Sequence, residues 1–237
     1  VVFSEKIFPR ERALLANRRP PEREDDLTNL KKRTMRILIA CDKFKGSLSA
    51  AEACQAVFDG MKAAGAADEL QLCPITDGGD GFTETMLSAL PGEWRTCEAF
   101  DALHNPVEAR YGLLRNAAGE QEAVIERAEA SGLRRIPVGD RNILHSSTFG
   151  TGSMIWDAVN NAGAQRILVG LGGSAANDGG IGMAAALGTR FLDADGNELE
   201  PIPAAMGELA AINQDNRIEL PPIEVACTIE NPMIGEN

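Results

Sequence analysis

The sequence predicts an α/β protein, because apolar runs of strand length alternate with segments of helical periodicity from Met35 onward. Glycine-rich loops follow three of the apolar runs. Ligands of open α/β sheets gather at the carboxyl ends of strands, so these loops are the first candidates for a site. The expected strands lie at 36–41, 70–75, 94–99, 107–114, 122–126 and 166–171, and the expected helices at 50–64, at 82–90, from Gly152 and after Gly180.

The longest loop is Gly170-Leu-Gly-Gly-Ser-Ala-Ala-Asn-Asp-Gly-Gly180, which joins an apolar strand to an alanine-rich helix. Glycines let backbone N–H groups approach a ligand closely, and the N-terminal amides of a helix favour anions. We therefore expect an anion cradle at this loop. Its candidate residues are Gly172, Gly173, Ser174 and Asn177. Asp178 is a candidate general base, although it could equally cap the following helix, and the glycines could serve only the geometry of the turn.

A second loop, Asp42-Lys-Phe-Lys-Gly-Ser47, follows the first apolar strand. Ser49 and Glu52 then form the pattern of a capping box at the start of a helix. The loop places Lys45 and Ser47 at the carboxyl end of a strand. Lys45 is a candidate clamp for a phosphate or a carboxylate, and its alternative is an ordinary surface lysine.

The third loop is Asp77-Gly-Gly-Asp-Gly81, between an apolar strand and a helix. Two carboxylates in a flexible turn can hold a hard cation such as Mg²⁺ through oxygen. Asp77 and Asp80 are therefore candidate metal-linked and catalytic carboxylates, and Gly78 and Gly79 are candidates for phosphate binding. The alternative is a plain turn.

Composition excludes several classes of protein. The net charge of −12 argues against binding a nucleic-acid backbone, and 5% aromatic content argues against a platform for stacking bases. The five cysteines are widely spaced without a Cys-x-x-Cys pair, which predicts neither a zinc site nor a disulfide framework and favours a cytoplasmic location. No apolar run reaches the roughly 20 residues of a membrane span. The sequence also lacks a Walker motif and a Gly-x-Ser-x-Gly elbow.

Together and in this order, the motifs resemble the glycerate kinase family of the bacterial two-domain type. The resemblance covers about 35–237 and is carried by 39–49, 76–81, 128–133, 148–152, 170–180, 191–198 and 225–232. It implies phosphoryl transfer from ATP, with Mg²⁺, to a hydroxyl of D-glycerate. It also adds Thr151, in Thr148-Phe-Gly-Thr-Gly152, to the expected phosphate-binding residues.

Three residues depart from the family pattern. Asp80 stands where the family usually carries Glu, Thr228 where it tends to have Asp, and Glu129 where a small residue is usual. Family members also continue well beyond the equivalent of Asn237, so the chain resembles a C-terminally truncated member. We expect weakened activity and self-association of an incomplete domain.

The resemblance implies a Rossmann-like first domain into which a second α/β domain is inserted. We expect 35–95 to form half of the first domain and 96–237 to form the second. Residues 1–34 carry nine Lys or Arg against six Asp or Glu, although the whole chain is acidic, and they lack helical periodicity. We interpret them as a disordered or non-native extension.

The sequence thus predicts a glycerate kinase that acts on a small molecule and binds neither nucleic acid nor membrane. Two alternatives stay open. One is a non-catalytic fragment that binds an anion or a partner chain, and the other is a magnesium-dependent phosphosugar hydrolase that uses the two aspartates of the 77–81 turn.

Overall fold

The computed structural model describes residues 35–66 and 69–229, so the predicted extension 1–34 lies outside the described residues. The chain separates into two compact units, the first ending at Pro74 and the second starting at Ile75. Among the described helices, none is long and apolar enough to cross a membrane.

The first unit contains two parallel strands, β1 (Arg36–Ile39) and β2 (Glu69–Leu72), joined by helix α3 (Ala50–Ala63). The capping box predicted at the start of α3 is confirmed: the Glu52 amide donates to Ser49 Oγ at 3.2 Å, and the Ser49 amide donates to Glu52 Oε2 at 2.7 Å. Ile39 is buried, whereas Leu38 is 58% exposed. The apolar strand is therefore only partly covered by the described residues.

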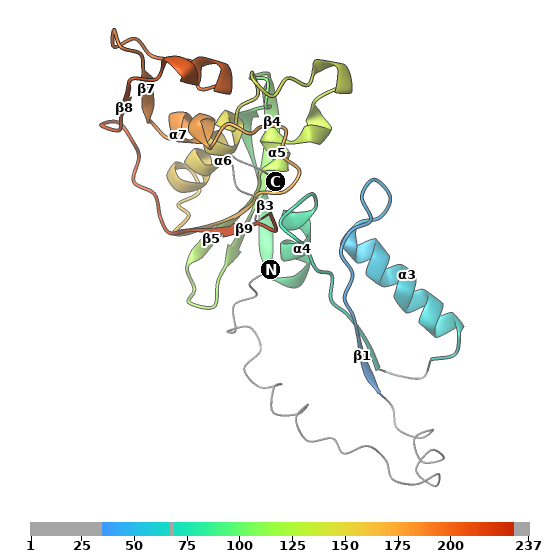
Figure 1. Cartoon of the computed structure of the whole chain (residues 1–237). Coiled ribbons are helices and arrows are strands. Elements are labelled where there is room, and N and C mark those ends of the chain that lie inside the picture. The colour runs from blue at the N-terminus through green and yellow to red at the C-terminus, as the bar shows by residue number, and fades with distance from the viewer. Residues whose placement is uncertain (1–34, 67–68, 230–237) are drawn as a thin grey trace, which may run out of the picture. The chain divides into compact units, whose positions relative to one another are not determined.

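The second unit is built on a mixed five-stranded sheet in the order β3-β4-β5-β6-β9 (Figure 1). Its strands are β3 (Gly92–Phe100), β4 (Pro106–Arg115), β5 (Gln121–Glu126), β6 (Arg166–Gly170) and β9 (Ile223–Ala226). The pairs β3–β4 and β4–β5 are antiparallel, whereas β5, β6 and β9 run parallel. The α/β class predicted from the sequence is confirmed.

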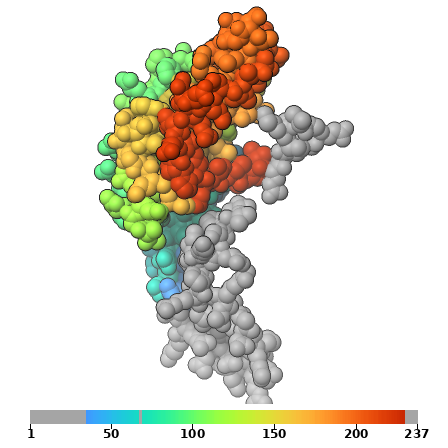
Figure 2. Space-filling model, turned by 90° about the vertical axis from the view of Figure 1, so that its left-hand side faces the viewer, coloured from blue at the N-terminus to red at the C-terminus, as the bar shows by residue number. Residues whose placement is uncertain are grey.

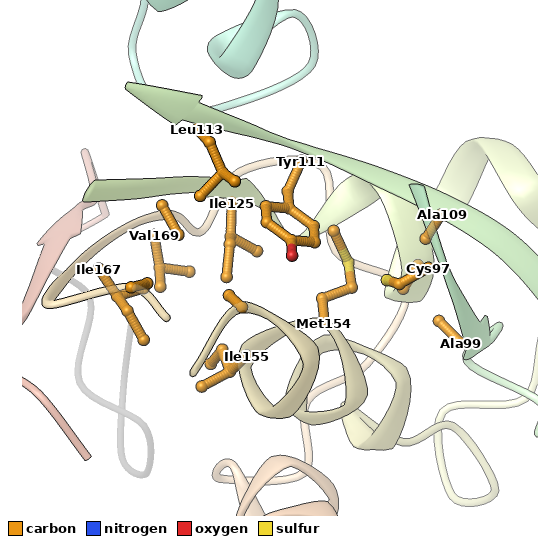
Figure 3. Close-up of a cluster of buried hydrophobic side chains, with 14 of the residues drawn as sticks. Cys97, Ala99, Ala109, Tyr111, Leu113, Ile125, Met154, Ile155, Ile167 and Val169 are labelled. Atoms are coloured by element: carbon orange, nitrogen blue, oxygen red, sulfur yellow. The ribbon is translucent and has the colours of Figure 1, made fainter. Parts of the chain in front are cut away.

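Alternating side chains of β5 serve two different faces of the sheet. Ala123 and Ile125 pack with Met154 and Ile155 of helix α6 (Phe149–Asn160), and Figure 3 shows these two helix residues among the side chains of the buried cluster. Val124 packs instead with Phe82 of helix α4 (Phe82–Ala89). The two-residue period of the strand therefore gives each face its own helix.

Residues 75–95 belong to this second unit, because Phe82 packs on its sheet. The division into a domain at 35–95 and an inserted domain at 96–237 stays a prediction.

The remaining elements surround the ends of this sheet. They are α5 (Ala128–Ser131), α7 (Ile181–Ala186), the 3₁₀ turns Leu133–Arg135, Val138–Asp140 and Pro203–Glu208, and the antiparallel pair β7 (Arg190–Leu192) and β8 (Ala211–Asn213). The pair β7–β8 projects at one end of the unit (Figures 1 and 2). Neither this pair nor β9 was predicted as strands from the sequence.

Candidate functional site

Two of the predicted loops meet at the carboxyl end of the parallel strands. The amide of Gly172 donates to the carbonyl oxygen of Gly78 at 2.9 Å. A Cβ atom on Gly172 would lie 2.4 Å from the Cα atom of Gly79, a distance that real Cβ contacts do not show. The 77–81 turn and the 170–180 loop therefore touch through their backbones, and glycine is required for this approach.

Asp80 lies directly beside the 170–180 loop. A Cβ atom on Gly173 would lie 2.9 Å from Asp80 Oδ1. This oxygen is buried and has no hydrogen-bond partner in the part of the chain that the structure describes, although 43% of the side chain as a whole is exposed. Asp77 is placed differently, because its Oδ1 accepts the Gly79 amide at 2.9 Å and so stabilises the turn itself.

Arg134 connects three carboxylates near this contact. Its guanidinium lies 2.5 Å from Glu129, 3.4 Å from Glu126 and 3.9 Å from Asp80, measured between nitrogen and oxygen atoms. Glu126 ends strand β5 and is 3% exposed. Burial raises the pKa of Glu126 to about 7, and the charge of Arg134 partly opposes this rise. The site therefore contains a carboxyl group that titrates near neutral pH.

Glu129, one of the three departures from the family pattern, has arginine partners. Besides Arg134, its carboxylate lies 3.6 Å from Arg135 and 3.8 Å from Arg110. A buried carboxylate is tolerated when cations and hydrogen bonds compensate its charge. The three arginines supply that compensation here.

Asp178 holds two loops together rather than facing an open site. Its Oδ2 accepts from the amide and the hydroxyl of Thr148, both at 2.8 Å, and from the Gly182 amide at 3.1 Å. Its Oδ1 accepts the Gly180 amide at 3.0 Å, and the residue is buried. These contacts correspond to the capping alternative that the sequence analysis left open.

Only part of the expected anion cradle has free amides. The Gly172 amide is bonded to Gly78, as described above, whereas the amides of Gly173 and Ser174 donate no hydrogen bond to the described residues. The Ser174 hydroxyl donates to the Ala176 carbonyl at 2.8 Å and accepts the Ala176 amide at 3.1 Å. Ser174 thus offers its amide, while its hydroxyl is used within the loop.

The 170–180 loop also forms one wall of a hollow of about 420 Å³. Ser174 and Asn177 line it on the loop side, and Asn177 is exposed. The facing wall combines apolar and polar side chains, namely Leu133, Ile136, Arg141, Asn142, Ile143 and Ser146. A hollow of this size and mixed lining suits a small organic molecule.

The comparisons with known proteins bear on what this site does. A model of the glycerate kinase family matches residues 37–237. The chain belongs to the glycerate kinase family. It is 42% identical over 204 residues to a glycerate kinase of Bacillus subtilis (strain 168), an alignment that covers 85% of this chain and 52% of that protein. It is 38% identical over 209 residues to a glycerate 2-kinase of Escherichia coli (strain K12), with 86% and 53% covered.

A solved structure agrees with this family assignment. A crystal structure assigned as glycerate kinase 2 from Salmonella typhimurium LT2 matches with a TM-score of 0.72 and 38% sequence identity. The match covers 85% of this chain and 55% of that one. The chain therefore spans about half the length of the glycerate kinases that it matches.

Two residues that the sequence analysis selected as candidates for ligand binding, Lys45 and Ser47, lie on a tight turn of the first unit. Lys45 and Ser47 are exposed there, between Phe44 and Leu48, whose backbones bond at 2.8 Å. Gly46 has φ of 74°, the left-handed conformation that favours glycine. The structure thus presents Lys45 to solvent at the carboxyl end of β1.

Thr151 is the expected residue that lies furthest from solvent. It is fully buried, and its hydroxyl lies 3.0 Å from the hydroxyl of Ser131. The structure does not bring it to the surface of the site, so its contact with a phosphate stays a prediction.

The described residues offer few side-chain ligands for a magnesium ion. Among the described residues, no group of three His, Cys, Asp or Glu side chains could hold a metal ion. Mg²⁺ is commonly held by one or two carboxylates together with substrate phosphates and water. Asp80 Oδ1, which has an ion pair with Arg134 but accepts no hydrogen bond from the described residues, fits such a role, and Asp77 belongs to the same turn.

Sequence reasoning missed the charged residues Glu126, Arg127 and Arg134. Glu126 is the last residue of strand β5, and Arg127 and Arg134 follow it within eight residues, so the strand-end rule that selected Asp77 and Lys45 could have found them.

Proposed function

We propose that this chain is part of a glycerate kinase that transfers a phosphoryl group from ATP to a hydroxyl of D-glycerate. The observation that carries the proposal is the contact of Asp80 with Gly173, where the 77–81 turn meets the 170–180 loop. Family membership supplies the reaction class, and this contact supplies a carboxylate beside two free amides.

Phosphoryl transfer depends mainly on placing charges around the transferred group. The amides of Gly173 and Ser174 would donate to phosphate oxygens, with Gly78 and Gly79 allowing close approach. Asp77 and Asp80 would hold Mg²⁺, which offsets negative charge on the phosphates when it is bound. Lys45 would bind a phosphate or the carboxylate of glycerate from the first unit.

The contacts of Asp178 favour a positioning role. A carboxylate that accepts four hydrogen bonds has little capacity left to take a proton from a substrate hydroxyl. We therefore propose that Asp178 fixes the 170–180 loop against Thr148. The hollow beside Ser174 and Asn177 would accept the non-reacting part of one substrate.

The family match favours the kinase over a phosphosugar hydrolase. A non-catalytic fragment stays the second candidate, because the chain spans about half the length of its relatives. The partners of the proposed kinase are small molecules in the cytoplasm, and neither nucleic acid nor a membrane is involved. The five free cysteines are compatible with that compartment.

The test is ATP consumption with D-glycerate and Mg²⁺. It compares this chain with the same chain continued by a C-terminal part of a family member. We expect glycerate-dependent ADP release from the longer protein and little from this chain, because phosphoryl transfer depends on positioning by the complete site. Equal and robust turnover by both would contradict the dependence on length. ADP release that does not depend on glycerate would contradict the kinase proposal.

A further inference from the structure

Arg127 lies at the start of the 170–180 loop. It follows the last residue of β5, and its amide donates to the Gly170 carbonyl oxygen at 3.0 Å. Its side chain returns to the same segment, where Nη2 donates to the Leu171 carbonyl oxygen. The guanidinium is therefore held beside the loop by one backbone contact.

The charge of Arg127 has no direct counter-charge. Arg134, which lies near this end of the sheet, contacts three carboxylates, whereas no carboxylate of the described residues forms an ion pair with Arg127. Its Nε is buried and has no hydrogen-bond partner among residues 35–66 and 69–229. Asp178 is the nearby acid that favours the charged form, but its carboxylate is already engaged by four donors.

A partly buried cation without an ion pair is unfavourable, because burial removes hydration that nothing replaces. Burial accordingly lowers the pKa of the Arg127 guanidinium. Arginine nevertheless stays protonated in proteins, so its charge attracts an anion from solution. The reactants of the proposed kinase carry such groups, as phosphates or as a carboxylate.

We propose that Arg127 binds an oxyanion of the reactants, either a phosphate group or the substrate carboxylate, beside the 170–180 loop. This inference rests on the proposed function for the identity of the anion. Arg127 would supply the positive charge that the free amides of Gly173 and Ser174 only partly provide. The competing role is a purely structural one, in which Arg127 holds the Leu171 carbonyl and binds no ligand.

The structure offers a matched control in Arg115. Its Nη1 also donates to a single backbone carbonyl, that of Gly119 at 3.1 Å. No ion pair with the described residues is found for Arg115 either, but it is the last residue of β4, which runs antiparallel to β5, so it lies at the opposite end of the sheet from the carboxyl end of β5. Replacement of Arg115 removes the same chemical group from a place where no anion is expected.

The test measures dissociation constants of this 237-residue chain for inorganic phosphate and, separately, for D-glycerate, by calorimetry or by amide shifts in NMR spectra. The variants are Arg127→Gln, Arg127→Lys and Arg115→Gln, with thermal unfolding followed on the same samples. Gln keeps an N–H donor on a side chain two bonds shorter and carries no charge, whereas Lys keeps the charge.

We expect Arg127→Gln to raise the dissociation constant of one of the two anions by about 10-fold or more. A hydrogen bond to a charged group contributes a free energy of this size. Arg127→Lys should lose less affinity for that anion, and Arg115→Gln should bind both anions like the parent chain. The anion that weakens identifies the ligand group. The proposal is overturned if the parent chain binds neither anion, if a folded Arg127→Gln variant binds both normally, or if Arg115→Gln weakens binding equally. Because these experiments measure binding and not turnover, such a result would overturn the role of Arg127 without deciding the kinase proposal, which the ADP-release assay tests separately.

Discussion

The carboxylate of Asp178 and the backbone and hydroxyl of Thr148 are joined by two hydrogen bonds of 2.8 Å, across thirty residues of sequence. This pair ties the 170–180 loop to the start of α6. The Thr148 hydroxyl in turn accepts the Met183 amide at 2.9 Å, which extends the connection to α7. The order of the glycine-rich loop thus depends on a small buried polar network.

Asp178→Ala should destabilise the second unit. The change leaves buried donors of Thr148, Gly180 and Gly182 unpaired, and each such loss typically costs about 1–3 kcal/mol. We expect a loss of at least about 2 kcal/mol in the free energy of unfolding, measured with urea. Asp195→Ala, in an exposed turn, is the control and should change little. Equal stability of the two variants would show that the Asp178 network contributes nothing.

Gly172→Ala should disturb the contact between the 77–81 turn and the 170–180 loop. The added Cβ would meet the Cα atom of Gly79 at 2.4 Å and the nitrogen of Gly79 at 2.8 Å, so backbone must move. We expect lower thermal stability and changed amide shifts in both loops in NMR spectra. Gly139→Ala is the matched control, because a Cβ there meets no atom within 4 Å. Shifts confined to the neighbours of residue 172 in sequence would argue against the contact.

Glu126 should make stability depend on pH. Its folded pKa of about 7 is above the ordinary value of 4.5, so the folded state binds the proton more tightly than the unfolded state does. The stability contributed by the protonated form is complete below about pH 4.5 and is lost as the pH rises to about 7. The loss is at most on the order of 3 kcal/mol.

The measurement for Glu126 compares urea unfolding of the parent chain and Glu126→Gln across this range. The parent should lose stability relative to the variant as the pH rises. Arg134→Met should raise the Glu126 pKa further, seen by NMR titration of the carboxyl carbon, because the arginine charge lowers that pKa. A difference between parent and Gln variant that is constant with pH would contradict the assignment.

The first unit should promote self-association of this chain. Leu38 of β1 and Leu72 of β2 are 58% and 38% exposed, and Val57 of α3 is also exposed. Exposed apolar side chains near a short, open sheet favour association. Sedimentation should show oligomers that weaken in a Leu38→Lys variant. A monodisperse monomer would contradict this expectation, and Leu90→Lys tests whether any exposed leucine gives the same effect.

The sequence predicted the elements with strong local signals. The apolar runs at 122–126 and 166–171 became β5 and β6, and Ser49 with Glu52 correctly marked the start of α3. Short elements with weak patterns, such as β7 and β8, were missed, because three residues carry too little periodicity to be recognised.

The loops of the site were found from glycine and aspartate spacing, but their charge partners were not. The contacts of Arg134 with Asp80, Glu126 and Glu129 depend on how the chain folds back at the end of β5, and spacing does not show which charges meet. For the same reason, the sequence left Asp178 open as either a general base or a helix cap. Whether a carboxylate caps a helix or faces a ligand depends on Thr148, thirty residues away.

The most direct test of the account is glycerate-dependent ADP release by the chain continued to the length of its relatives, with and without Asp80→Asn. In the proposed role Asp80 helps to hold Mg²⁺, so its loss should lower turnover by about 100-fold or more, since the charge of the ion would act on the transferred phosphoryl group. The melting temperature should change by only a few degrees, as for ordinary partly exposed residues. Normal turnover of the Asp80→Asn protein across a magnesium titration, or no glycerate-dependent ADP release by the parent, would contradict the account.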